Sequence, residues 1–127
     1  MAKRVFVSFD YDYDRFLKEA LISQARKTDS PFAVHDWSIK EPSWDWKMKA
    51  RRRIRACDIV IVMCGEHTHV ASGVSTELEI TRDESIGYFL LKGYDRKECT
   101  KPAAARVSDN MYDWTWPNLK LLIGGAR

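Results

Sequence analysis

The chain contains 127 residues and carries a formal net charge of +3 at neutral pH. Its length is typical of one domain, so we expect a single domain over residues 1–127. Hydrophobic residues make up 45% of the chain and charged residues 31%, a mixture too apolar for a disordered protein. A mildly basic balance does not by itself predict nucleic-acid binding, and we expect none.

Two features of the sequence bear on where the protein resides. No apolar run approaches the roughly 18 residues that a membrane-spanning helix needs, and the apolar stretch after Arg4 is too short for a signal-peptide core. The three cysteines, Cys57, Cys64 and Cys99, are odd in number and unevenly spaced, which suggests reduced thiols rather than disulfides. We therefore expect a cytoplasmic protein with no membrane partner.

Four segments are predicted to be strands because they are rich in apolar and β-branched residues. In chain order they cover residues 4–10, 32–37, 58–64 and 86–91. The segment 58–64 is continuously apolar, which is typical of a central parallel strand covered on both faces. After residue 91 the pattern becomes irregular.

Helical spacing of apolar residues predicts a helix after each of the first three strands and one near the end of the chain. These helices are the segment from Asp12 or Asp14 to about Lys27, and residues 44–55, 74–84 and 118–123. Ser43 is the expected N-cap of the second helix, and Pro42 lies in the loop before it. Strands that alternate with helices predict an α/β fold with a parallel sheet, whose ligand crevice lies at the carboxyl ends of the strands.

A group of residues with metal-ligating side chains follows the central strand. It consists of Cys64, Glu66, His67 and His69. Alternatively, Cys64 completes the strand and the histidines lie on a solvated loop. No second cluster of ligands appears elsewhere in the sequence, so we expect no metal site.

The predicted second helix carries a run of basic side chains. They are Lys47, Lys49, Arg51, Arg52, Arg53 and Arg55. A basic helix can follow phosphates, but the same run also fits a solvated face paired with the protein's own acidic residues. An anionic partner or a self-assembly contact are further interpretations.

Carboxylates follow the first two predicted strands. They are Asp10, Asp12, Asp14 and Asp36. Such residues could hold Mg²⁺, as in receiver domains. A receiver would have its phosphoacceptor at the carboxyl end of the third strand, where this chain has Met63-Cys64-Gly65, and this argues against a receiver domain.

Glu77 lies close to the start of the third predicted helix, where the helix dipole favours an ionised carboxylate. From spacing alone, a simple capping charge is the alternative. Glu79 is a rival two positions on, and side chains two residues apart on a helix point about 200° from each other. The two carboxylates therefore cannot face the same crevice.

Several short segments, in this order and spacing, resemble the TIR-like domains of the Thoeris anti-phage component ThsB. The resemblance extends over about residues 4–93. The segments are Val5-Phe6-Val7-Ser8-Phe9, Asp36-Trp37-Ser38, residues 54–62, Cys64-Gly65 with Thr68, and Val74-Ser75-Thr76-Glu77-Leu78. The chain departs from the family pattern at Gly73, where the family usually has Trp.

The resemblance implies a flavodoxin-like, three-layer TIR fold with a central parallel sheet of four or five strands. It also implies cleavage of the nicotinamide–ribose bond of NAD, with NAD as substrate and no separate cofactor. The product would be an ADP-ribose-derived nucleotide signal that reaches a separate effector protein. Activity would accompany homo-oligomeric assembly, as it commonly does for TIR enzymes.

The family's catalytic glutamate falls on Glu77, because an aliphatic residue follows it and Val74 precedes it by three. The residues expected to contact substrate lie at strand ends: Ser8, Phe9, Asp10, Tyr11, Asp36, Trp37, Ser38 and Gly65. Core packing is an alternative for Phe9 and Trp37, and turn formation for Ser8 and Asp10. Two other functions remain open: a non-catalytic TIR-like interaction module and a deoxyribosyltransferase-like enzyme acting on nucleosides.

Overall fold

The computed structural model describes residues 2–40 and 43–127, which form a sheet flanked by helices. The strands are β1 (Lys3–Ser8), β2 (Phe32–Trp37), β3 (Ile59–Cys64), β4 (Gly87–Lys92) and β5 (Met111–Tyr112). The helices are α1 (Arg15–Ala25), α2 (Trp46–Arg55), α3 (Ser72–Asp83) and α4 (Trp116–Ile123), with a short 3₁₀ helix η1 (Thr68–Val70). None of the helices in these two ranges is both long and apolar enough to cross a membrane.

The sheet is entirely parallel and has the strand order β2-β1-β3-β4-β5. This is the flavodoxin-like order, in which the chain direction across the sheet reverses after β2. All six residues of β3 are buried, as the continuous apolar run predicts for a central strand. The fold class expected from the sequence is therefore confirmed.

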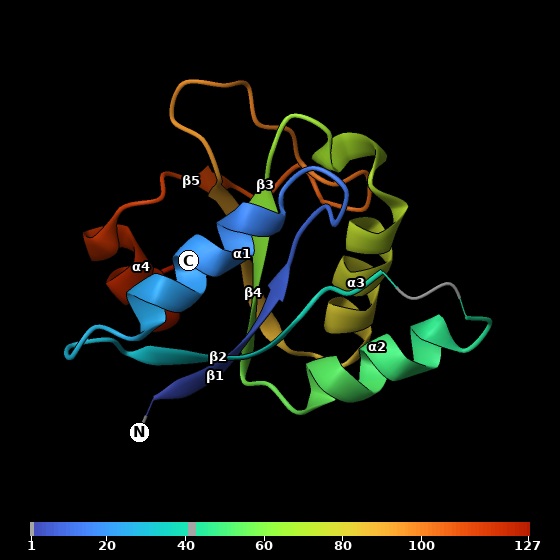
Figure 1. The fold of residues 1–127 in the computed structure, drawn as a ribbon, viewed down its shortest axis with the longest axis horizontal. Coiled ribbons are helices and arrows are strands. Elements are labelled where there is room, and N and C mark those ends of the chain that lie inside the picture. The colour runs from blue at the N-terminus through green and yellow to red at the C-terminus, as the bar shows by residue number, and fades with distance from the viewer. Residues whose placement is uncertain (1, 41–42) are drawn as a thin grey trace.

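Alternating side chains along β3 divide the interior into two cores. Ile59, Ile61 and Met63 pack with apolar residues of α1 and α4 on one face. Val60, Val62 and Cys64 pack with residues of α2 and α3 on the other. Figure 1 shows the first pair of helices to one side of the sheet and the second pair to the other. The arrangement is the expected three layers.

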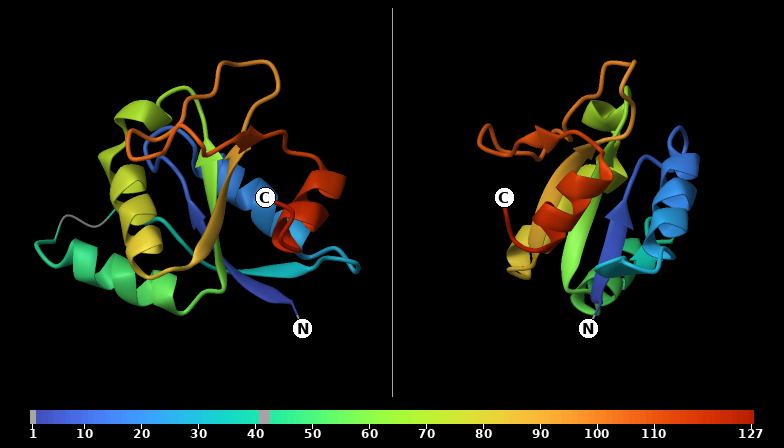
Figure 2. Two further views of the ribbon diagram at one scale, coloured as in Figure 1. Left: turned by 180° about the vertical axis from the view of Figure 1, so that it is seen from behind. Right: turned by 90° about the vertical axis from the view of Figure 1, so that its left-hand side faces the viewer.

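The segment between β4 and β5 passes over the carboxyl ends of the strands (Figure 2). It is attached to the loop after β3, because the Thr100 N–H donates to the Gly65 carbonyl at 2.9 Å. It is also attached to α3, because the Ala104 N–H donates to Ser75 Oγ at 3.1 Å. This segment therefore belongs to the same edge of the sheet at which the sequence predicts a ligand crevice.

Some predicted boundaries differ from those observed. Helix α2 begins at Trp46 with Asp45, not Ser43, at its N-cap, and Pro42 lies outside the described residues. Helix α4 begins two residues earlier than predicted, because the Thr115 hydroxyl accepts from the Asn118 N–H and proline suits the first turn. Strand β5 was not predicted, since two residues are too few to show a period.

Candidate active site

The side chain of Glu77 is buried between α3 and the ends of β1 and β2, with 2% of its surface exposed. Its Oε1 accepts hydrogen bonds from Ser8 Oγ at 2.7 Å and from Ser38 Oγ at 2.6 Å. Ser8 ends β1, and Ser38 follows the adjacent strand β2, its N–H donating to the Val7 carbonyl at 3.0 Å. Parallel pairing of these strands thus places both hydroxyls at one carboxylate oxygen.

Burial raises the pKa of Glu77 from 4.5 to about 7. The hydrogen bonds from Ser38 and Ser8 and the positive charge of Arg53 oppose this increase, whereas Asp36 adds to it. Arg53 and Asp36 are themselves an ion pair, with Nε and Oδ2 3.5 Å apart. Glu77 is therefore a carboxyl group that changes its charge near neutral pH, a property concentrated at functional sites.

Glu77 does not act as a helix cap. It is the sixth residue of α3, beyond the first turn, whose N–H groups a capping side chain would accept. Glu79, the rival carboxylate, is exposed to solvent on another side of the same helix. The capping interpretation of Glu77 is therefore wrong.

A cavity of about 470 Å³ lies beside Glu77, within the range of small-molecule sites. Neither serine hydroxyl contacts Glu77 Oε2, and among the described residues no donor reaches it. Oε2 has no hydrogen-bond partner among the described residues, and it is not fully buried. It is therefore exposed to the cavity that Glu77 lines. The wall is formed by Phe9–Tyr13, Ser38–Lys40, Trp46, Val70–Val74, Thr76 and Glu77.

Five of the nine residues predicted to be catalytic or to contact substrate line this cavity. They are Phe9, Asp10, Tyr11, Ser38 and Glu77. Ser8 does not line it but hydrogen-bonds to Glu77. Phe9 also packs in the core beside α1, with its ring centroid 6.3 Å from that of Tyr11. The Asp10 carboxylate accepts from the Asp12 N–H at 3.1 Å and so shapes the turn after β1.

Asp36, Trp37 and Gly65 do not line the cavity, in contrast to their predicted role. Trp37 faces the opposite core, where the Lys18 ammonium lies 4.9 Å from its ring centroid. The Asp36 carboxylate pairs with Arg53. Gly65 packs against Asp14, and a Cβ at this glycine would lie 2.5 Å from Asp14 Oδ2. A side chain at position 65 would therefore have to displace the Asp14 carboxylate.

Trp46 is the main residue of the cavity wall that sequence reasoning did not assign to the site. Its indole lies opposite the start of α3, and a Cβ placed on Gly73 would lie 3.8 Å from Trp46 Cζ2. The indole N–H donates to the Ile39 carbonyl at 3.4 Å. Gly73 stands where the family pattern has Trp, and the indole beside it belongs to Trp46 of α2 instead.

The side chains after β3 that could ligate a metal do not come together at one point. Cys64 is buried in the sheet, where burial raises the pKa of its thiol above the ordinary value. The His67 ring stacks on Tyr13 with centroids 3.9 Å apart, and His69 Nδ1 lies 3.0 Å from Thr100 Oγ1. Over residues 2–40 and 43–127, no group of three or more His, Cys, Asp and Glu side chains could hold a metal ion.

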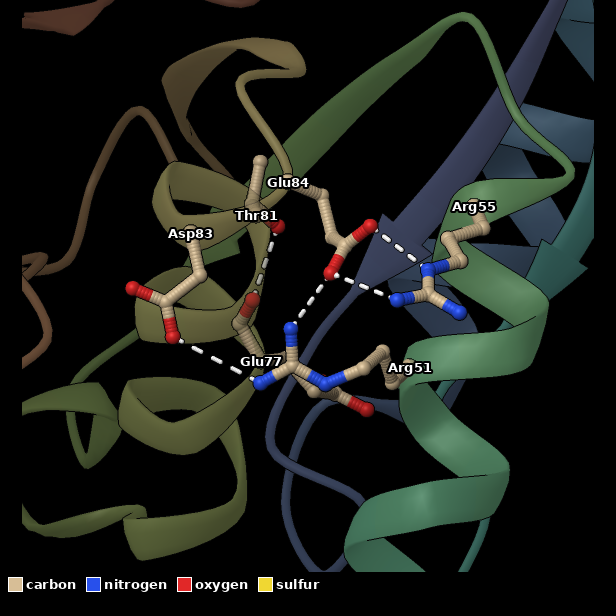
Figure 3. A network of polar contacts seen from close by, with 6 residues as sticks. All are labelled: Arg51, Arg55, Glu77, Thr81, Asp83 and Glu84. Atoms are coloured by element: carbon tan, nitrogen blue, oxygen red, sulfur yellow. Dashed lines mark hydrogen bonds and ion pairs between the residues drawn. The ribbon is translucent and has the colours of Figure 1, made fainter.

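The basic run on α2 is partly paired within the protein. Figure 3 shows Arg51 and Arg55, both on α2, with their guanidinium groups directed at the carboxylate of Glu84, the C-cap residue of α3. Arg51 also contacts Asp83 at 3.5 Å. These pairs agree with the interpretation of the run as a face that binds the protein's own acidic residues.

The five-stranded parallel sheet and a buried glutamate at its carboxyl edge define a flavodoxin-like α/β protein with a candidate active site at that edge. The sequence model of the Thoeris protein ThsB, TIR-like domain, matches residues 6–92, more than half of the chain. The chain therefore belongs to the ThsB TIR-like domain family, which points to a role in anti-phage defence. None of the curated proteins matches the sequence.

Proposed function

We propose that this protein cleaves the nicotinamide–ribose bond of NAD, with Glu77 as the catalytic residue. One observation carries the proposal: a buried carboxylate has one oxygen bound by two serine hydroxyls and the other open to a cavity of ligand size. Membership of the ThsB family supports the same function. NAD is the substrate here, and the proposal needs no cofactor.

Cleavage of the nicotinamide–ribose bond requires mainly a negative charge beside C1′ of the ribose. When the C1′–N bond breaks, its electron pair goes to the ring nitrogen, and nicotinamide leaves as a neutral molecule. Positive charge develops on C1′ and the ring oxygen of ribose, and a carboxylate beside them stabilises it. Water or an internal hydroxyl of the nucleotide then adds to C1′ and releases a proton.

The two serine bonds have a defined part in this proposal. They favour the ionised form of Glu77 and fix the carboxylate, so that Oε2 meets the ribose without rearrangement. Burial has the opposite effect on the charge, and the balance gives a pKa of about 7. The cleavage rate is therefore expected to rise with pH through about pH 7, where half of the Glu77 carboxyl groups are ionised, and to level off above it.

The proposal extends to the setting of the reaction. The released ADP-ribose, cyclised or conjugated, would act as a nucleotide signal on a separate effector protein in the cytoplasm. Homo-oligomeric assembly would accompany activity. Family membership is the support for these steps.

The test is NAD consumption by the full chain, with the products separated by chromatography. Wild type should release nicotinamide, and Glu77→Gln should lose activity by at least about a thousandfold, because the neutral amide cannot stabilise the developing cation. Glu79→Gln is the matched control, since this exposed carboxylate lies on the same helix outside the cavity.

Equal rates for Glu77→Gln and wild type would contradict the proposal. Absence of NAD loss at every protein concentration would favour the interaction-module alternative. Cleavage of free nucleosides in preference to NAD would favour the deoxyribosyltransferase-like alternative.

A further inference from the structure

An irregularity in the pairing of β1 with β2 decides which side chains of β2 face the helices α2 and α3. Val5 pairs with Val34. The next residue, Phe6, pairs with Asp36, so β2 has one extra residue at this point. Such a bulge changes the face to which the following side chains point, and bulges are frequent beside active sites. Phe6 packs in the core on the side of α2 and α3, and Asp36 opposite it therefore faces those helices as well.

The same register brings Asp36 to the face on which Ser38 meets Glu77. Side chains two residues apart on a strand share a face, and their Cα atoms are about 6.6 Å apart. Ser38 donates to Glu77 Oε1 at 2.6 Å, so Asp36 lies one step along β2 from a direct partner of Glu77. Asp36 does not line the cavity, whereas Glu77 Oε2 is exposed to it. Asp36 is therefore on the side of Glu77 that faces the protein interior.

Asp36 holds the guanidinium of Arg53 in this place. The distance from Arg53 Nε to Asp36 Oδ2 is 3.5 Å, and the two side chains are only 29% and 28% exposed. Water and salt screen a partly buried pair less than a surface pair. Both charges act on Glu77, and the attraction to Arg53 exceeds the repulsion from Asp36. The ion pair therefore favours a negative charge on Glu77.

The other groups around Glu77 on this side are neutral or already paired. Two serine hydroxyls contact the carboxylate directly. Arg51, also on α2, pairs with Glu84 at the end of α3. The Cys57 thiol, on which Asp36 also acts, remains protonated because burial raises its pKa to about 12. Of all the charges that act on Glu77, that of Arg53 has the largest effect.

The groups across the cavity do not replace Arg53 as a source of positive charge. The wall there carries the carboxylates of Asp10 and Asp12 and the ammonium of Lys40. Lys40 pairs with Asp12 at 3.0 Å, and both side chains are more than half exposed, so solvent screens their effect on Glu77. The charge that favours ionised Glu77 thus comes from α2.

We propose that Arg53 is a positioning residue for the reaction at Glu77, with Asp36 holding its guanidinium beside the buried carboxylate as the counter-charge of the ionised form. The inference rests on the proposed function, because cleavage uses the ionised carboxylate. It assigns a part in the reaction to a residue of α2 that does not line the cavity. It also makes the charge of Glu77 depend on how α2 packs against the sheet.

The ionisation of Glu77 can be measured without turnover, by NMR titration of its side-chain carboxyl carbon in the full chain. Arg53→Gln should move the titration midpoint upward by at least about half a pH unit, because the favourable charge is lost. Arg53→Lys should move it less, because the charge is kept although the planar guanidinium is lost. Arg52→Gln is the matched control, since Arg52 is the exposed neighbour of Arg53 on the same helix.

A second pair of variants isolates Arg53 without leaving a carboxylate unpaired. Asp36→Asn removes one charge of the ion pair, and Asp36→Asn combined with Arg53→Gln removes both. The double variant should titrate at a higher pH than Asp36→Asn, because only the single variant retains the guanidinium. Equal midpoints for these two proteins would overturn the inference, as would equal shifts for Arg53→Gln and Arg52→Gln.

Turnover separates a positioning role from a structural one. If NAD is cleaved, the midpoint of the pH–rate profile should rise in Arg53→Gln together with the NMR midpoint, and most of the lost rate should return at high pH. A loss of rate at every pH with an unchanged midpoint would contradict the inference. The proposed function fails separately, through equal NAD cleavage by Glu77→Gln and wild type, and that result would leave the titration of Glu77 unchanged.

Discussion

Two glutamates on α3 and at its end have opposite surroundings. In the middle of the helix, Glu77 is buried, contacts two neutral hydroxyls, and has a pKa raised to about 7. About two turns later, at the C-cap, Glu84 accepts hydrogen bonds from Arg55 and Arg51 of α2, and these bonds lower its pKa (Figure 3). The comparison shows that surroundings, rather than residue type, decide which carboxylate retains a proton near neutrality.

The largest expected effect concerns stability against pH. The folded state holds the Glu77 proton up to about pH 7 and the unfolded state only to about 4.5, so stability should fall as pH rises between these values. A difference of this size corresponds to about 3 kcal/mol in the free energy of unfolding. Urea titrations of wild type and Glu77→Gln from pH 4 to 8 measure it.

The Glu77→Gln variant lacks the titrating group, so its stability relative to wild type should increase across that interval. Parallel pH profiles for the two proteins would show that Glu77 is not the group responsible. Glu79→Gln again serves as the control, because its carboxylate is exposed in the folded state.

A smaller effect is expected when the hydroxyls are removed. Ser8→Ala with Ser38→Ala deletes both hydrogen bonds to Oε1, so the pKa of Glu77 should rise further. NAD cleavage at pH 7 should then fall by about fivefold to tenfold and recover in part at higher pH. The measurement is a pH–rate profile, with Ser23→Ala as the control, because Ser23 is an exposed serine of α1 outside the cavity.

If the midpoint of the pH–rate profile is the same in the double serine variant and in wild type, the two hydroxyls do not affect the pKa of Glu77. A uniform loss of rate at every pH would instead indicate that they only orient the carboxylate.

The smallest effect is expected at Glu84, the C-cap residue of α3. Glu84→Gln removes the charge that Arg51 and Arg55 share, so the melting temperature should fall slightly at neutral pH and low salt. Because the pKa of Glu84 is lowered in the folded protein, this stabilisation is fully present above the ordinary glutamate pKa and is lost as pH falls through the lowered pKa of the folded state. Thermal melts at several salt concentrations check it.

High salt should reduce the difference between Glu84→Gln and wild type, because the pairs are near the surface. A difference that persists in high salt would point to packing of the side chain instead.

The sheet could be predicted from the sequence because its strands are apolar runs. The family resemblance selected Glu77 among the carboxylates.

The prediction that Trp37 contacts substrate was wrong because side chains alternate along β2. Since Ser38 faces Glu77, the neighbouring Trp37 side chain must point to the other face. Asp36 was mistaken for a substrate contact because its partner, Arg53, is distant in sequence. The place of Trp46 beside Gly73 depends on how α2 packs against α3, which no local pattern encodes.

Strand β2 lies at the edge of the sheet and pairs there with β1. Edge elements open more readily than central ones, and such local opening is measured by amide hydrogen exchange. Each opening of the end of β2 breaks the bond from the Ser38 N–H to the Val7 carbonyl and withdraws one hydroxyl from Glu77. The pKa of Glu77 is thereby coupled to local opening at the end of β2. Hydrogen exchange at the Ser38 amide should therefore measure the fraction of molecules in which Ser38 still donates to Glu77.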